Sequence, residues 1–429
     1  MTATERRTGV DDQQGNASGT IGGVLRRPPV VALVAAEVIS ATGSQMTALA
    51  LPWFVLTTTG SPSRMALVVA AEVLPWALLG IPAGTAAARL GLRRTLVICN
   101  LCWVPLLALI PVLHYAGALT FGVLLALAAL SGALWPAYLA SQHALLPTLV
   151  GENRRAVAQA SALLFSAMRI TYMAGPALAG VLIALWGAPT VLLVDAASFL
   201  VAALLIVSFV PAAGRPAAPP GYVGMLAGLR FLARDPFLRP LTVAQVISQA
   251  AFQALVISLP VLAFARYGES SGIAGLLLAA WGGGALLGSA LSYRTTTRWD
   301  IVRTGEVAWL LQALPLWLLA GRVPAAAAAA LLAASGLGNG FRVPAMQALA
   351  LVRTPAALRP QTGAVASSLA MLGGVLALAA AGPVLAEFGT TPVLTGVASL
   401  STLAAGFGML ASARERAHAH APARMAVRS

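Results

Sequence analysis

Long apolar stretches, separated by short polar or Pro/Gly-rich breaks, run through the chain from residue 30 to residue 411. An α-helix needs about 20 consecutive apolar residues to cross a bilayer, and stretches of roughly this length recur along the chain. The pattern predicts an all-α membrane protein with twelve transmembrane helices. They fall at 30–57, 65–88, 95–115, 118–146, 156–184, 189–210, 241–265, 272–293, 303–320, 324–351, 362–387 and 391–411.

Composition agrees with a chain embedded in lipid. Of the 429 residues, 59% are hydrophobic and 9% are charged, whereas about a quarter of the residues of a soluble domain are charged. The net charge of +14 comes entirely from arginine, since the chain contains no lysine. No basic face or recognition motif gathers these arginines, so we expect the lipid bilayer and not a nucleic acid as the partner.

Arginine placement predicts the topology. With the N-terminus in the cytoplasm, 22 of the 27 arginines fall in cytoplasmic segments, and Arg64, Arg266 and Arg322 fall outside. Cytoplasmic loops of membrane proteins carry such an excess of positive charge, and one missed crossing would invert every later loop. We therefore expect a multi-pass protein of the bacterial inner (plasma) membrane with both termini in the cytoplasm.

One long internal loop divides the chain. It begins with a Pro/Ala/Gly-rich linker, and its apolar residues between 225 and 232 accompany Arg230 and Arg234, which indicates an amphipathic helix on the inner leaflet. The predicted organisation is a cytoplasmic tail (1–29), a six-helix bundle (30–210), a cytoplasmic linker loop (211–240), a second six-helix bundle (241–411) and a cytoplasmic tail (412–429).

The two predicted bundles are sequence repeats. Matches recur at an offset of 207 or 208 residues, between 38–40 and 246–248, 51–52 and 259–260, 135–137 and 343–345, and 175–176 and 382–383. Six helices per copy give both copies the same orientation, so the repeats are parallel. In transporters built in this way, the substrate site lies near the bilayer midplane between the copies.

Several of these segments resemble one family. The loop at 80–94, with its glycines and basic residues, resembles the signature loop of the major facilitator superfamily, and Gly175-Pro176 resembles the Gly-Pro motif of its antiporters. Residues 40–46, 51–52, 59–62 and 195–199 resemble the branch that contains enterobactin and macrolide exporters. The resemblance implies an efflux transporter whose gating elements include Gly84, Arg89, Gly91, Arg93, Arg94, Gly175 and Pro176.

The chain departs from the family pattern at two places. Ala88 occupies the position of the loop acid, which helps to lock one gate in relatives, and Leu92 replaces the usual following arginine. The fourth predicted helix also lacks the arginine that is associated with proton transfer in many drug antiporters.

Polar residues within the helices are candidates for the transport chemistry, because a charge near the bilayer centre is costly. Glu37, Ser40, Ser44 and Thr47 share one face of the first helix by spacing, and their repeat counterparts begin at Gln245. We expect these faces to line a substrate cavity and Glu37 to couple protons; the alternative is that Glu37 is merely hydrated near the cytoplasmic interface. The candidate cavity residues are Ser40, Ser44, Thr47, Arg169, Tyr172, Gln245, Gln249 and Gln253.

Four further charges lie within the predicted helices. Glu72 is either a second coupling residue or a carboxylate in the outer vestibule. Arg169 either binds an anionic group of the substrate or pairs with Glu37 or Glu72. For Asp195 we expect a hydrated cap or a structural hydrogen bond, and for Arg342 a side chain that snorkels to the interface. Since the acids lie mostly in the first half, we expect the second half mainly to shape the pocket.

Together these features predict a secondary active transporter that exports small amphipathic molecules in exchange for protons. The alternatives on the same fold are a symporter, a lysolipid transporter or a transport-inactive receptor. The sequence contains no nucleotide-binding loop of the Walker type. An enzyme would need a cluster of nucleophile, base or metal ligands, which the sequence does not suggest. We expect no cofactor and no metal, the proton gradient as the energy source, and a monomer.

Overall fold

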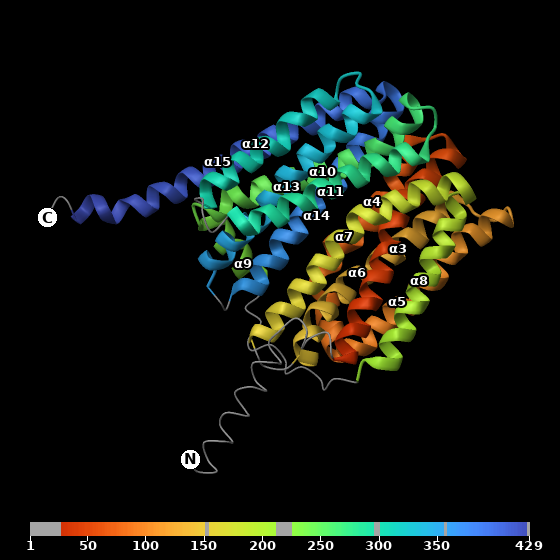
Figure 1. Cartoon of the computed structure of the whole chain (residues 1–429), viewed down its shortest axis with the longest axis horizontal. Helices are drawn as coiled ribbons and strands as arrows, with labels where there is room; N and C mark the ends of the chain where they lie inside the picture. Colours follow the sequence, from red (N-terminus) through yellow and green to blue (C-terminus); the bar gives the residue numbers. More distant parts are fainter. Residues whose placement is uncertain (1–26, 151–153, 212–224, 296–300, 356–357, 427–429) are drawn as a thin grey trace, which may run out of the picture.

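The structure is a computed structural model that describes residues 27–150, 154–211, 225–295, 301–355 and 358–426, and all statements below concern these residues. It is built from helices (Figure 1). The first half contains α3 (Pro28–Thr59), α4 (Pro62–Leu90), α5 (Leu92–Tyr115), α6 (Phe121–Val150), α7 (Arg154–Trp186) and α8 (Ala188–Phe209). The short α9 (Met225–Arg234) precedes α10 (Leu238–Arg266), α11 (Ser271–Thr295), α12 (Ile301–Leu319), α13 (Ala325–Arg353), α14 (Arg359–Phe388) and α15 (Thr390–Ala426).

The long helices coincide with the predicted apolar stretches, and their ends generally agree within a few residues. The largest difference is α15, which continues to Ala426 and projects beyond the bundle (Figure 1). Ten of the long helices are apolar enough to cross a membrane, and α12 and α13 are not among them. Arg303 and Glu306 in α12, and Asn339 and Arg342 in α13, lower their apolar character. The all-α fold is confirmed, whereas the number of twelve crossings stays a prediction.

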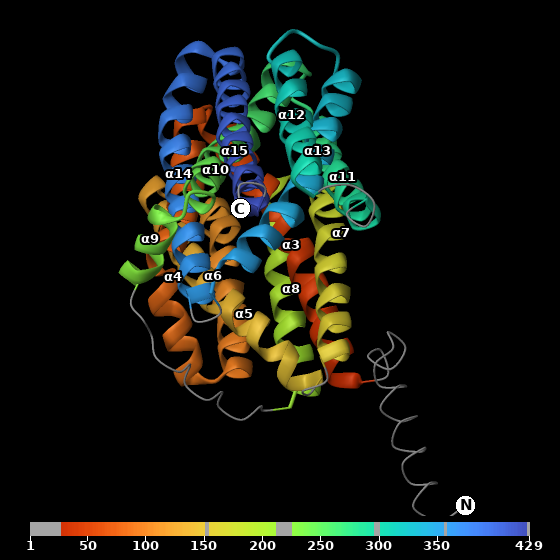
Figure 2. The ribbon, with the colours of Figure 1, turned by 90° about the vertical axis from the view of Figure 1, so that its left-hand side faces the viewer.

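The helices form two bundles, α3–α8 and α10–α15, which lie side by side in both views (Figures 1 and 2). Within the first bundle α3 packs on α8 and α4 on α6; within the second α10 packs on α15 and α11 on α13. Two seams join the bundles, one between α7 and α11 and the other between α4 and α14. The sequence repeat relates α4 to α11 and α7 to α14. The α7–α11 seam is therefore the repeat counterpart of the α4–α14 seam.

The bundles are packed tightly at the end opposite α9, where α7 finishes and α11 begins. Ser271 Oγ donates a hydrogen bond of 3.1 Å to the backbone oxygen of Gly180 across the seam. In the other seam, a Cβ at Gly382 would lie 2.7 Å from the Cβ of Ala66. Glycines therefore bring the helices of the two bundles into direct backbone contact, which closes this end.

The predicted amphipathic helix is present as α9, and it packs against the second bundle. Its Gly228 faces the backbone of Gln361 in α14, where a Cβ would lie 2.9 Å from the carbonyl carbon. Leu232 is buried in a small core with Phe237 and Leu238 at the start of α10. This packing makes α9 part of the second bundle, and its predicted position on the inner leaflet stays a prediction.

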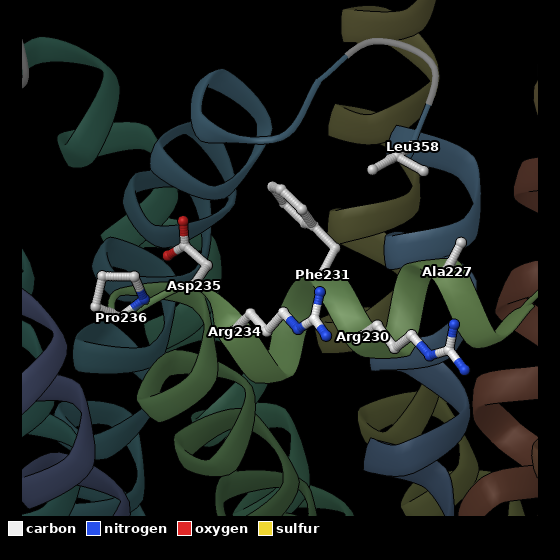
Figure 3. Close-up of a pocket in the computed structure, with 7 residues that line it drawn as sticks. All are labelled: Ala227, Arg230, Phe231, Arg234, Asp235, Pro236 and Leu358. Carbon is white, nitrogen blue, oxygen red and sulfur yellow. The ribbon is translucent and has the colours of Figure 1, made fainter.

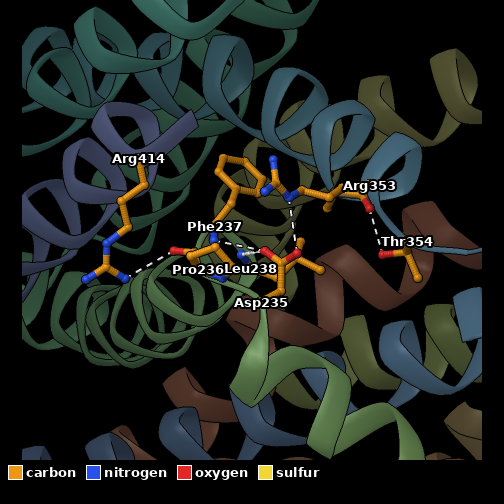
Figure 4. Close-up of polar contacts among 8 residues, drawn as sticks. Asp235, Pro236, Phe237, Leu238, Arg353, Thr354 and Arg414 are labelled. Carbon is orange, nitrogen blue, oxygen red and sulfur yellow. Dashed lines mark hydrogen bonds and ion pairs between the residues drawn. The ribbon is translucent and has the colours of Figure 1, made fainter. Parts of the chain in front are cut away.

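Asp235 and the neighbouring Pro236 join the end of α9 to α10, α13 and α15 (Figure 4). Its Oδ1 accepts hydrogen bonds of 2.8 Å from the backbone N–H groups of Phe237 and Leu238, and its Oδ2 lies 3.1 Å from Nε of Arg353 in α13. Arg414 of α15 donates to the backbone oxygen of Pro236 at 3.1 Å. Partial burial alone would raise the pKa of Asp235, but the two N–H donors and Arg353 outweigh it and lower the pKa below its ordinary value.

Candidate functional site: a cavity between the two halves

A cavity of about 470 Å³ lies between the bundles, a size within the range of small-molecule sites. Side chains from six helices, α4, α7, α10, α11, α13 and α14, form its wall. The wall contains four aromatic and four amide side chains, and two arginines contribute the charge. The lining residues are Trp76, Arg169, Tyr172, Gln245, Ser248, Gln249, Phe252, Trp281, Gly282, Ala285, Asn339, Arg342, Val343, Met346, Gln347, Ala366, Ser367, Ala370 and Met371.

Four of the predicted cavity residues lie in this wall, namely Arg169, Tyr172, Gln245 and Gln249. Helical spacing brings each pair to one side of its helix, since Arg169 and Tyr172 are three residues apart in α7 and Gln245 and Gln249 are four apart in α10. The two pairs come from different halves. The structure therefore brings together groups that lie more than 70 residues apart in the sequence.

The other four predicted cavity residues are placed elsewhere. Ser44 Oγ donates to the backbone oxygen of Ser40 at 2.9 Å, and Ser40 Oγ lies 3.5 Å from the hydroxyl of Tyr138 in α6. Thr47 donates a hydrogen bond of 2.6 Å to Oδ2 of Asp195 in α8. Thus Ser40 and Thr47 contact helices of their own bundle.

Gln253 is buried against α14. A Cβ at Gly374 would lie 2.8 Å from its Cγ. On the cavity side of α10, Gln245 and Gln249 are joined instead by Ser248 and Phe252.

Glu37 is buried inside the first bundle, with 1% of its surface exposed. Gln142 of α6 donates a hydrogen bond of 2.6 Å to its Oε2. Its Oε1 has no hydrogen-bond partner, and no arginine of the described chain lies within 4.0 Å of the carboxyl group. The alternative of a merely hydrated carboxylate is wrong for this conformation, because the group is dry and is held by a neutral amide.

Asp195 has a structural hydrogen-bond network and is not a hydrated cap. It is 1% exposed, its Oδ2 accepts from Thr47, and its Oδ1 accepts from Ser198 at 3.1 Å. Gly43 of α3 lies directly opposite, where a Cβ would overlap Oδ1. Glycine at position 43 therefore makes room for the carboxyl group, and of the two readings of Asp195 the structural one is supported.

The predicted pairing of Arg169 with an acid is absent. Within the described part of the chain, neither Glu37 nor Glu72 lies within 4.0 Å of a basic side chain. Arg169 is half-buried and lines the cavity, whereas Glu72 is half-buried one turn from Trp76 and lies outside the lining set. Of the two roles considered for Arg169, contact with the substrate is the one that its position supports.

Arg342 was missed as a site residue, and the prediction that it snorkels to the interface is wrong. It is 6% exposed, and its Nε donates to Oε1 of Gln312 in α12 at 2.8 Å. One terminal nitrogen donates to Ser248 of α10 at 3.2 Å, and the guanidinium lies 4.2 Å from the ring centre of Trp309. The second half therefore contributes buried charge, contrary to the expectation that it mainly shapes the pocket. The available signal was the unexplained arginine within a predicted helix.

The signature loop is anchored to its own bundle. Gly91 adopts φ +94° between α4 and α5, a conformation that favours glycine. Arg93 donates to the backbone oxygen of Val207 at 2.6 Å, near the end of α8, where cations stabilise unpaired carbonyl groups. Arg89 and Arg94 are exposed, and the surroundings of Gly84 in α4 lie outside the described side chains.

The Gly-Pro motif lies at a helix crossing and at the seam. A Cβ at Gly175 would overlap the Cβ of Gln45 in α3. The backbone oxygen of Pro176 would lie 2.5 Å from a Cβ at Gly275 of α11. The motif therefore sets how closely α7 approaches both α3 and the other half.

A second hollow, of about 460 Å³, lies on α9 and is separate from the cavity (Figure 3). Its wall contains Arg230, Phe231 and Arg234 of α9, together with Leu358 ahead of α14. It shares no lining residue with the cavity between the bundles.

Two parallel six-helix halves that enclose one cavity and close it at one end define a transporter of the alternating-access type. The chain belongs to the Major Facilitator Superfamily, whose sequence profile matches residues 33–378.

Relatives and solved structures agree with this assignment. The chain is 28% identical over 367 residues to the multidrug efflux pump Tap of Mycolicibacterium fortuitum, covering 83% of this chain and 89% of that one. It is 27% identical over 372 residues to the pump Tap of Mycobacterium tuberculosis, covering 83% and 87%. In fold it is similar to an inward-facing bacterial homologue of the lysosomal transporter Spinster, with TM-score 0.71, 15% identity and coverage of 89% and 96%. For the nucleoside transporter NupG the TM-score is 0.72, the identity 13% and the coverage 89% and 99%.

Proposed function

We propose that this chain exports small amphipathic molecules from the bacterial cytoplasm in exchange for protons. The observation that carries the proposal is the cavity between the halves, with its aromatic and amide wall and its closure by glycine-rich seams at one end. The two halves, 30–210 and 241–411, rock against each other so that the cavity faces each side of the membrane in turn. Relatives named multidrug efflux pumps support the direction and the substrate type.

In this proposal Glu37 exchanges the proton, with Glu72 as a second candidate. A carboxyl group that is dry in one state and hydrated in the other has different proton affinities in the two states, which is what coupling requires. Glu37 is dry here, and the neutral amide of Gln142 donates a hydrogen bond to it. If rocking of the first half admits water beside Gln142, the carboxyl group of Glu37 becomes hydrated. This change does not require an ion pair to be broken.

The proposed arrangement places both termini and α9 in the cytoplasm, and a single chain forms the transport unit. Ala88 in place of the family acid removes one means of locking the gate. Arg93, bonded to the end of α8, keeps the signature loop on the first bundle, so that the loop moves with this half as one body.

The test is flux in proteoliposomes that contain the purified protein and carry an imposed pH gradient. Fluorescent amphipathic compounds should accumulate against their gradient on the side opposite α9 when protons flow the other way, and collapse of the gradient should abolish the accumulation. Accumulation in the same direction as the protons would identify a symporter. Absence of flux for every compound, with binding retained, would identify a receptor.

A further inference from the structure

The cavity presents two cationic side chains and no carboxyl group among the described residues that line it. Arg169 comes from α7 of the first half and Arg342 from α13 of the second. The carboxyl groups of Glu37 and Asp195 are buried within the first bundle and bonded there to neutral partners. The wall therefore carries positive charge without a counter-charge.

Arg342 is held in place by a built environment. Gln312 accepts from its Nε, Ser248 accepts from a terminal nitrogen, and Trp309 lies beneath the guanidinium. Trp309 in turn packs against Gly408 of α15, where a Cβ would overlap the indole nitrogen. Three helices thus fix the plane and position of one guanidinium at the cavity wall.

The N–H donors of the Arg342 guanidinium that remain unused indicate that a ligand binds beside it. A guanidinium has five N–H donors, and hydrogen bonds within the described chain use two of those of Arg342. No carboxylate of the described chain lies within 4.0 Å of it. A buried cation without a counter-ion is costly, and an anion that binds beside it offsets this cost. Trp76, Phe252 and Trp281 line the same cavity, so the wall offers aromatic surface as well as positive charge to an amphipathic ligand.

We infer that Arg342 is an anion-binding subsite of the cavity, with Arg169 as a second cationic contact, and that the transported class is amphipathic organic anions bearing a carboxylate or similar oxyanion. This inference rests on the proposed transport function. A neutral analogue leaves the guanidinium unpaired, so we expect the anion to bind about tenfold or more tightly than its neutral analogue.

Three probes that share one fluorophore test the inference. Dansyl-norleucine is an anion, its methyl ester is neutral, and dansylcadaverine is a cation. Binding to the full chain in lipid nanodiscs is measured by energy transfer from tryptophan to dansyl, with empty nanodiscs subtracted; Trp76 and Trp281 line the site. The wild type should prefer the acid to the ester about tenfold or more. Arg342→Gln should lose most of this preference, with the remainder due to Arg169, and Arg342→Lys should lose less of it.

Arg322→Gln, an exposed arginine of the same half, is the matched control and should bind as the wild type does. If Arg342→Gln fails to fold, as judged by gel filtration, Arg169→Gln and the charge preference of the wild type decide. Equal or tighter binding of the ester or of dansylcadaverine by the wild type overturns the inference, as does a preference of wild-type size in Arg342→Gln. Failure of dansyl-norleucine to bind at millimolar concentration overturns it too.

Flux of the same probes separates this inference from the proposed function. Proton-driven transport of the ester or the cation without a preference for the acid would leave the exporter intact and overturn the anion subsite. Selective binding of the acid that depends on Arg342, without gradient-dependent flux of any probe, would support the subsite and count against transport.

Discussion

The seam between α7 and α11 gives a quantitative test of alternating access. A Cβ at Gly275 would lie 2.5 Å from the backbone oxygen of Pro176 and 2.9 Å from Cα of Gly180. Non-bonded atoms prefer separations of about 3.5 Å or more, so the helices must part by about 1 Å to accept Gly275→Ala. Both opposing groups are backbone atoms and cannot rotate away, in contrast to a flexible side chain.

Overpacking of this kind costs about 1–3 kcal/mol. The cost applies only while this end of the molecule is closed, because the clash disappears when the seam opens. Gly275→Ala should therefore shift the closed-to-open ratio about 5- to 150-fold toward the open state. Gly272→Ala is the matched control one turn away, since its Cβ would meet only Ser270 Oγ, at 3.7 Å.

The assay is labelling of a cavity cysteine, Gln249→Cys, in a background in which Cys99 and Cys102 are replaced. A membrane-impermeant maleimide is added from the side opposite α9, and the initial labelling rate is measured. Gly275→Ala should raise this rate, while Gly272→Ala should leave it unchanged. Equal rates in the two variants would show that the seam does not control access, and the rocking mechanism would lose its structural basis.

Three further predictions concern the coupling site, the Asp235 junction and the topology. Glu37→Gln keeps the shape of the group but cannot titrate; in proteoliposomes it should exchange substrate down its gradient and lose uphill transport, and uphill transport at the wild-type rate would exclude Glu37 as the coupling site. Asp235→Ala should lower stability in detergent by about 1–2 kcal/mol at pH 7 through the lost cap and ion pair. Because the folded-state pKa is lowered, this stabilisation is present above the ordinary pKa and is lost as the pH falls; the difference in thermal midpoint should shrink below about pH 4, and a constant difference would show that charge is not involved. Reporter fusions after residues 215 and 424 should read cytoplasmic and one after Arg322 external, whereas an external reading at 215 would refute the six-plus-six arrangement.

The helices were predictable because lipid imposes a length and an apolar composition that can be read without knowing any neighbour. α9 was predictable for a related reason, since its alternation of leucine and arginine defines an apolar and a polar side. It was harder to predict which side of a transmembrane helix faces the cavity. Spacing places Glu37, Ser40 and Thr47 on one face, but whether that face meets α6, α8 or the cavity depends on packing.

Arg342 shows the same limit of prediction from a single sequence. Its position within a predicted helix was visible, but its partners are Gln312, 30 residues away, and Ser248, 94 residues away. A hydrogen bond over such a separation has no signature in a single sequence. The environment of the Arg342 guanidinium is therefore visible only when α10, α12 and α13 are placed together.

α9 is attached to α10, α13 and α14 and therefore belongs to the second half. The segment that connects the two halves thus ends where α9 begins. The relative position of the halves is then set by the seams, as in a dimer of separate subunits. In such a dimer the connecting segment acts mainly as a tether that raises the effective concentration of one half near the other. Lengthening it ahead of Met225 would dilute that concentration gradually while the faces that meet at the seams stay the same.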